Sequence, residues 1–168
     1  MGIMSLHRGV DTTFMKKFLL SFIYAGHGIW YCVRHERNFR IHLVATFYAL
    51  ALAALLSLQK GEWAALLTII AVVITAEATN TAIERAVDLS TEKVHSTARI
   101  AKDAAAGAVL FCALISVIIG VILFYRPEEL CALGAQFWEA PWKMLLLAIS
   151  IAVSLLFIFR GGASSAKK

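Results

Sequence analysis

Long apolar runs alternate with short polar connections along the chain, and the runs have the length of membrane-spanning helices. Spans are predicted over residues 40–58, 62–89, 98–125 and 142–159. A span needs about 20 mainly apolar residues, so the last run is only just long enough. A tight turn at Gln59–Gly61 and the stop signal Arg126-Pro127 separate the runs. Residues 128–141 are expected to form an exposed loop with a short amphipathic helix, and 161–168 a disordered tail.

A different pattern precedes the first span. Residues 14–34 carry apolar and aromatic side chains on one face, with Lys17 and Arg34 near the ends, and Gly26 and Gly28 interrupt the run. This pattern favours an amphipathic helix that lies in the membrane interface. A secretory signal peptide is the competing interpretation, because basic residues precede an apolar stretch, but no small-x-small cleavage site follows.

Composition supports a membrane protein. The chain has 168 residues, of which 60% are hydrophobic, and its mean hydropathy is +0.76. A soluble domain of this size cannot bury so much apolar surface, so the excess must face lipid. We therefore predict an all-α integral membrane protein with an N-terminal surface helix, three core transmembrane helices and a fourth C-terminal one. Residues 1–127 would form the main membrane domain and 128–168 a C-terminal extension.

The net charge of +5 does not indicate nucleic acid, because the basic residues flank the apolar runs instead of covering a soluble face. With the N-terminus inside, 13 Lys and Arg residues are cytoplasmic and three are outside, namely Lys60, Arg126 and Lys143. The positive-inside rule therefore places both termini and the 89–101 connection in the cytoplasm. The three cysteines and five histidines lack the spacing of a disulfide framework or a zinc site.

The second predicted span carries a polar stripe. Its members are spaced three, four and four residues apart: Glu77, Asn80, Glu84 and Asp88. At about 100° per residue they fall within an arc of roughly 80°, with Thr81 beside them. Glu77 would lie in the inner leaflet, roughly 21 Å from Trp63. A carboxylate at that depth costs several kcal/mol unless it is paired, hydrated or protonated, which indicates a functional site. The alternative is a structural polar network between helices.

Further charges are expected at the inner interface beside this stripe. Lys102 and Asp103 begin the third span on a face shared with Arg99, and Glu36 precedes the first span. Carboxylates suit Mg²⁺, which also takes substrate phosphate oxygens, and a lysine can meet phosphates directly. These are the parts that phosphoryl transfer needs. No Walker A or kinase glycine-rich loop is present, which excludes a soluble-type nucleotide fold.

Two motifs resemble a known family. The runs Glu77-x-x-Asn80-Thr81-Ala82-Ile83-Glu84-x-x-x-Asp88 and Ala101-Lys102-Asp103-x-Ala105-Ala106-Gly107-Ala108-Val109-Leu110 resemble the prokaryotic diacylglycerol kinases, which include undecaprenol kinases. The resemblance covers roughly residues 14–125, and Glu36–His42 looks like the undecaprenol kinase branch. The family usually ends soon after its third span, whereas this chain adds about forty residues.

The resemblance implies a homotrimer in the bacterial plasma membrane, with active sites shared between neighbouring subunits at the cytoplasmic face. ATP would be the co-substrate and Mg²⁺ the cofactor. Glu77 matches the catalytic base, and Glu36 and Glu84 match the carboxylates that hold Mg-ATP. The implied nucleotide-binding residues are Tyr24, Lys17, Glu36, Asn80, Glu84, Asp88, Lys102 and Asp103.

Three functions remain open from the sequence. The first is phosphorylation of undecaprenol, favoured by the Glu36–His42 run. The second is phosphorylation of diacylglycerol to phosphatidic acid, since both acceptors present a hydroxyl on an apolar tail. The third is a small cation channel or transporter, which would explain a buried Glu77. It would not explain a stripe that continues to the headgroup region, and no inverted repeat supports a carrier.

Overall fold

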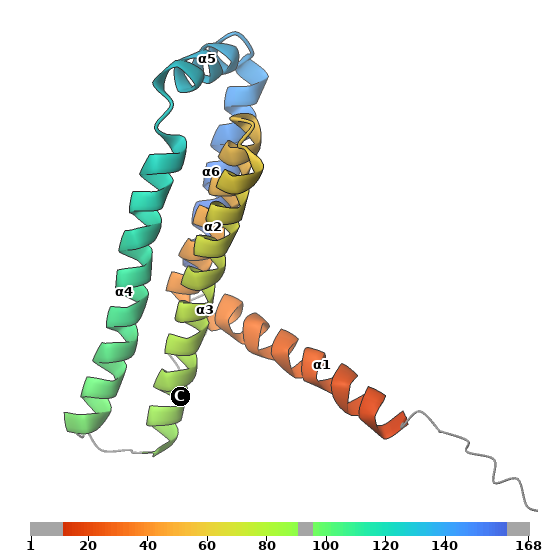
Figure 1. Ribbon diagram of the computed structural model, residues 1–168, viewed down its shortest axis with the longest axis vertical. Coiled ribbons are helices and arrows are strands. Elements are labelled where there is room, and N and C mark those ends of the chain that lie inside the picture. Colours follow the sequence, from red (N-terminus) through yellow and green to blue (C-terminus); the bar gives the residue numbers. More distant parts are fainter. Residues whose placement is uncertain (1–11, 91–95, 161–168) are drawn as a thin grey trace, which may run out of the picture.

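The computed structural model describes residues 12–90 and 96–160, which form six α-helices and, within those ranges, no strand. The helices are α1 (Thr12–His35), α2 (Arg37–Leu55), α3 (Lys60–Ser90), α4 (Ser96–Phe124), α5 (Pro127–Trp138) and α6 (Pro141–Arg160) (Figure 1). Side chains are described from Met15 onward. The predicted tail 161–168 and residues 91–95 of the predicted cytoplasmic connection lie outside the described residues.

Four of these helices, α2, α3, α4 and α6, are long and apolar enough to cross a membrane. Most of their large apolar side chains point outward: Phe111 is 66% exposed and Ile122 is 72% exposed. An apolar surface this continuous is far larger than a soluble monomer presents to water. The exposed faces therefore meet lipid, and the predicted all-α membrane fold with a fourth C-terminal span is confirmed.

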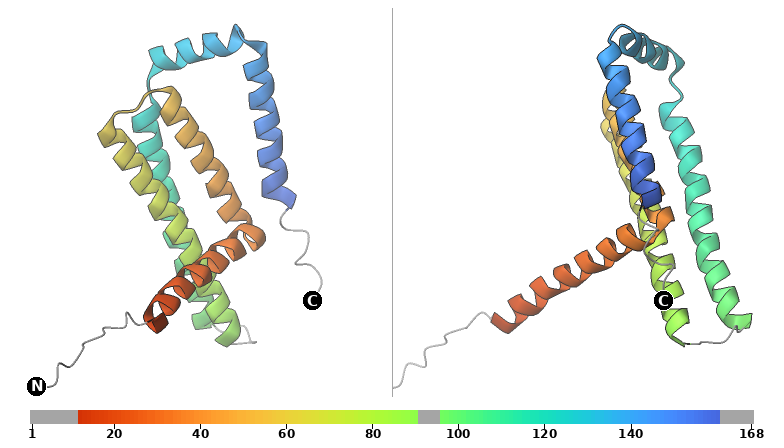
Figure 2. Two further views of the ribbon diagram at one scale, coloured as in Figure 1. Left: turned by 90° about the vertical axis from the view of Figure 1, so that its right-hand side faces the viewer. Right: turned by 180° about the vertical axis from the view of Figure 1, so that it is seen from behind.

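The spans form a bundle that α5 closes at one end. α3 and α4 pack side by side as an antiparallel hairpin, α2 packs against α3, and α6 lies along α2. α5 crosses the end of the bundle from α4 to α6, as Figure 2 shows from two sides. α1 leaves the bundle toward the opposite end and exposes apolar side chains such as Phe22 and Trp30. This geometry fits a helix lying in the membrane interface.

The connection between α2 and α3 comes earlier than the predicted turn at 59–61, because α3 already begins at Lys60. α2 ends in a Schellman motif, in which the Leu58 N–H donates to the Ala53 carbonyl at 3.1 Å. The Ser57 N–H donates to the Ala54 carbonyl at 3.3 Å, and Ser57 has φ 49°. Leu58 is buried, so its side chain fixes this helix end to the core.

The left-handed conformation of Ser57 leads to a stability prediction. An L-residue pays roughly 1 kcal/mol for this conformation, whereas glycine adopts it without a Cβ clash. We expect Ser57→Gly to raise the free energy of unfolding by about 0.5–1 kcal/mol, measured by thermal unfolding in detergent. Ser57→Ala is the matched control and should not stabilise. A glycine variant less stable than the alanine variant would contradict the prediction.

The short helix expected within residues 128–141 is present as α5, which fills most of that segment. Pro127 occupies one of its first two helical positions, where the missing N–H costs nothing, and Glu128 and Glu129 place negative charge in the first turn. Near this end of the bundle, Arg126 forms an ion pair with Glu62 at the start of α3. The helix and the ion pair together connect α4, α5 and α3.

Candidate active site

A single residue, Glu36, forms the corner between α1 and α2. α1 ends at His35 and α2 begins at Arg37, and Glu36 has an extended backbone with φ −102° and ψ 115°. The chain therefore turns sharply at this point. The Glu36 carboxylate accepts a hydrogen bond from Arg85 of α3 at 3.1 Å, which holds the corner against α3.

Glu77 lies buried where this corner meets α3. It is 3% exposed, and Thr81, which is 4% exposed, donates its hydroxyl proton to the Glu77 backbone carbonyl at 3.1 Å. The Glu77 carboxylate forms no hydrogen bond or ion pair with any other described residue. Cys32 of α1 is buried nearby, and this burial raises the pKa of its thiol. Glu77 is thus a buried acid left free to accept a proton.

Asn80 and Glu84 form a pair one turn further along α3. The Asn80 amide Nδ2 donates to Glu84 Oε1 at 2.9 Å, while the buried Asn80 Oδ1 has no hydrogen-bond partner in the described part of the chain. A buried acceptor without a donor is uncommon and requires an explanation. Amide and carboxylate oxygens are ligands that Mg²⁺ takes, together with water and phosphate oxygens. The pair therefore fits a hydrated cation or a donor group of a substrate.

No group of three or more His, Cys, Asp or Glu side chains within residues 12–90 and 96–160 is arranged to hold a metal ion. A magnesium ion bound by Glu36 and Glu84 would therefore need further ligands from water and the phosphates of ATP. This requirement matches the way Mg²⁺ binds in nucleotide sites.

Lys102 of α4 forms an ion pair with Asp88 at the end of the stripe. The two side chains are 37% and 53% exposed, and ion pairs with such access to water stabilise a fold only slightly. Opening this pair to admit a phosphate group therefore costs little. Asp103 pairs with a different cation: its Oδ2 lies 3.6 Å from Arg99 Nε, and its side chain is 72% exposed.

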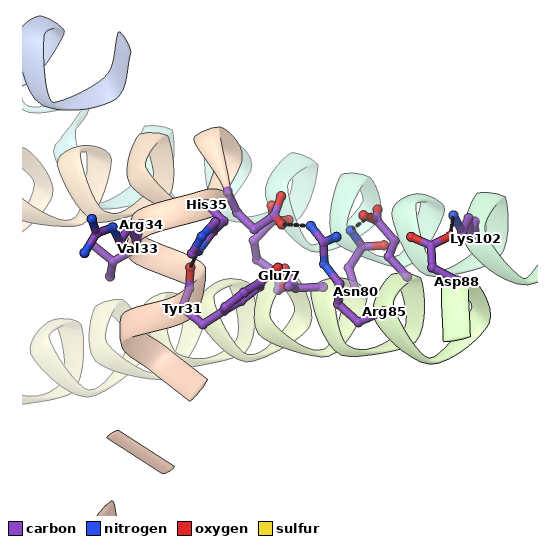
Figure 3. Close-up of polar contacts among 12 residues, drawn as sticks. Tyr31, Val33, Arg34, His35, Glu77, Asn80, Arg85, Asp88 and Lys102 are labelled. Carbon is purple, nitrogen blue, oxygen red and sulfur yellow. Dashed lines mark hydrogen bonds and ion pairs between the residues drawn. The ribbon is translucent and has the colours of Figure 1, made fainter. Parts of the chain in front are cut away.

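The structure brings together most, but not all, of the residues singled out from the sequence. Figure 3 shows Glu77, Asn80, Asp88 and Lys102 along one edge of the α3–α4 hairpin. Tyr24 is 66% exposed, and Lys17 is also exposed, on the part of α1 that leaves the bundle. Neither side chain has a hydrogen bond or ion pair with another described residue, so they do not join the stripe of their own chain.

Arg85 and Tyr31 are site residues that sequence reasoning missed. The Arg85 guanidinium lies 5.5 Å from the centre of the Tyr31 ring, and this ring stacks on His35 at 4.2 Å. The sequence could have indicated Arg85, because Glu77, Thr81 and Arg85 are spaced by four residues and therefore lie on one face of the helix. Nothing in the sequence indicated that this line would meet Glu36.

Comparison with known proteins connects this geometry to a family. The family model for prokaryotic diacylglycerol kinase matches residues 23–124, which include Glu36 and the whole stripe. Undecaprenol kinase from Bacillus subtilis is 46% identical over 110 residues, covering 66% of this chain and 89% of that protein. Diacylglycerol kinase from Synechocystis sp. is 42% identical over 110 residues, covering 65% of this chain and 63% of that relative. No solved structure matches the chain. α5 and α6 lie beyond the matched family residues.

Proposed function

Because the chain belongs to the prokaryotic diacylglycerol kinase family, we propose that it transfers the γ-phosphate of ATP to the hydroxyl of undecaprenol. The chain is a lipid kinase of a bacterial membrane, and thus a phosphotransferase that acts on an alcohol. The observation that carries the proposal is the edge of α3 that begins at the buried Glu77 and ends at the open Asp88–Lys102 pair.

In this mechanism Glu77 takes the proton from the lipid hydroxyl. The hydroxyl oxygen attacks the γ-phosphorus in line, a new P–O bond forms, and the bond to the β–γ bridging oxygen breaks to release ADP. Lys102 moves from Asp88 to the phosphates, which the exposure of the pair permits. Transfer is direct, without a phosphorylated enzyme. Mg²⁺ held by Glu36 and Glu84 would neutralise phosphate charge.

The depth of the residues supports this division of roles. From Glu77 to Asp88 the stripe rises roughly 16 Å along α3, at 1.5 Å per residue. The buried end of the stripe suits a hydroxyl carried on an apolar tail, and the open end suits a nucleotide arriving from water. Asn80 holds Glu84 between the two ends through its amide group.

We further propose a homotrimer with shared active sites and with the Glu36 corner on the cytoplasmic side. Lys17 and Tyr24 are exposed on α1, away from the stripe of their own chain, which leaves them free to approach the nucleotide of a neighbouring subunit. The excess of Lys and Arg around α1 and α3–α4 supports the orientation. Asp103 would bind nucleotide only after leaving Arg99.

The acceptor is tested by offering undecaprenol and diacylglycerol in parallel, with labelled ATP and Mg²⁺, to the purified protein. We expect kcat/KM to be at least about tenfold higher for undecaprenol than for diacylglycerol, a difference of about 1.4 kcal/mol in transition-state binding. The 42% identity to a protein named diacylglycerol kinase makes that lipid the second candidate. A preference for diacylglycerol would show that the proposed acceptor is wrong, while the proposed phosphotransfer reaction would stand. If neither lipid were phosphorylated, the proposal would be rejected.

The same assay in sealed vesicles tests the orientation. Protein molecules whose Glu36 corner faces the outside of the vesicle should phosphorylate lipid with externally added ATP. Molecules whose Glu36 corner faces the lumen should not. Use of ATP from the α5 side would reverse the proposed topology. Ion flux in vesicles without ATP would support the channel or transporter instead.

A further inference from the structure

Arg40 is the most deeply buried charged residue in the described part of the chain, at 2% exposed, and it connects two helix ends that are far apart in sequence. Its Nε donates to the Ile158 carbonyl of α6 at 3.1 Å. Its Nη1 donates to the carbonyls of Val33 and Arg34 of α1 at 3.0 and 3.2 Å. One guanidinium therefore binds α1 and α6 at once.

All three carbonyls lie in the last turn of a helix. α1 ends at His35 and α6 at Arg160, and the final four carbonyls of a helix have no partner within it. These ends also carry the negative pole of the helix dipole. No carboxylate lies within ion-pair distance of Arg40 among the described residues. The two helix ends therefore supply the negative potential that the buried cation needs.

α6 is held on α2 by a second polar contact along the same face. The Tyr48 hydroxyl lies 2.7 Å from Ser150 Oγ and 3.2 Å from Ser154 Oγ. Ser150, Ser154 and Ile158 are spaced by four, so they form one line on the helix surface. Most of the remaining α6 surface is exposed. Because hydrogen bonds between helices compete with few alternatives in lipid, these contacts fix the register of α6 on α2.

The position of Arg40 matters because the carbonyls it binds adjoin the Glu36 corner. Arg34 is two residues before Glu36, and the Glu36 N–H donates to the Cys32 carbonyl at 2.9 Å. Both views of Figure 2 place the last turn of α6 beside the corner where α1 meets α2. The Arg40 backbone belongs to α2, and its Nε is held by the Ile158 carbonyl of α6. These two attachments orient the guanidinium so that its Nη1 reaches the carbonyls of α1.

We propose that α6 positions Glu36 through Arg40, which makes the C-terminal extension part of the nucleotide-binding machinery of the kinase. The inference rests on the proposed role of Glu36 in holding Mg-ATP. Arg40 is a positioning residue: it touches neither lipid nor nucleotide and acts through the end of α1. α6 lies outside the family match at 23–124, so this connection adds an element that the matched region lacks.

The test uses full-length Arg40→Lys and Tyr48→Phe. Lysine cannot serve three carbonyls in a fixed fork, so we expect Arg40→Lys to raise KM for ATP at least about tenfold with a smaller change in kcat. Tyr48→Phe removes both contacts to the α6 serines and should raise KM about threefold. Tyr125→Phe is the matched control, because Tyr125 is 77% exposed and its hydroxyl contacts no other described residue. It should leave KM unchanged.

The double variant tests whether α6 acts through Arg40. If it does, Tyr48→Phe should change KM less than about 1.5-fold in the Arg40→Lys background, since the connection is already lost. If the KM changes of the two single variants multiplied in the double variant, the proposal would be overturned. It would also be overturned if the variants lowered the melting temperature and left KM for ATP unchanged. The affinity for a non-hydrolysable ATP analogue with Mg²⁺, measured without lipid, should follow the same pattern. That binding experiment reports on positioning even if the chain phosphorylates neither lipid. A Tyr48→Phe variant with unchanged affinity would also overturn the proposal.

Discussion

Replacement of Glu77 by glutamine is expected to lower kcat by roughly 10²–10⁴, the range that general base catalysis contributes. Glutamine keeps the size of the side chain but cannot accept the proton of the lipid hydroxyl. Glu77 is 3% exposed and its carboxylate has no partner among the described residues, so no neighbouring group is placed to take over its role. Single-turnover transfer of labelled phosphate measures the chemical step directly.

The affinity for ATP should change little in Glu77→Gln, because the nucleotide is expected at the other end of the stripe. Glu62→Gln is the matched control: Glu62 also lies on α3, but it pairs with Arg126 at the end near α5. We expect that control to lower the melting temperature and to keep kcat within about twofold. A Glu77→Gln enzyme that retains more than about a tenth of the parental kcat would exclude Glu77 as the base.

Glu84→Gln is expected to weaken the response to Mg²⁺. The variant keeps a side-chain oxygen that can accept the hydrogen bond from Asn80 Nδ2, which measures 2.9 Å in the parent. It removes the negative charge that a divalent cation needs. We expect the Mg²⁺ concentration for half-maximal activity to rise at least about tenfold, and kcat at saturating Mg²⁺ to fall by about 10². Initial rates over a Mg²⁺ titration at fixed ATP measure both values.

Glu128→Gln is the control for this second prediction. Glu128 is exposed in α5, away from the stripe, so its Mg²⁺ curve should match that of the parent. If Glu84→Gln lost activity without any shift of its Mg²⁺ curve, Glu84 would act on the substrate or the fold and not on the metal. An unchanged enzyme would remove Glu84 from the site.

Local pattern was sufficient for the helices and for the stripe. The apolar runs exceed what a soluble fold of 168 residues can bury, so the membrane class and the number of spans follow from composition and run length. The 3.6-residue period likewise places Glu77, Asn80 and Glu84 on one side of α3 wherever that helix sits. The prediction that was wrong concerns a helix end: capping bonds end α2 at Leu55, and α3 begins at Lys60, within the predicted turn at 59–61. The short helix expected within residues 128–141 is present as α5 and is longer than expected.

Contacts between distant segments could not be predicted in this way. The pair of Glu36 and Arg85 joins residues 49 positions apart, and Arg40 binds the Ile158 carbonyl across 118 positions. Periodicity defines the face of one helix but not which neighbouring helix covers that face. A backbone carbonyl, moreover, carries no sequence signature at all. Helices and their polar faces are therefore local properties of this chain, whereas the Glu36 corner and its connection to α6 arise from packing.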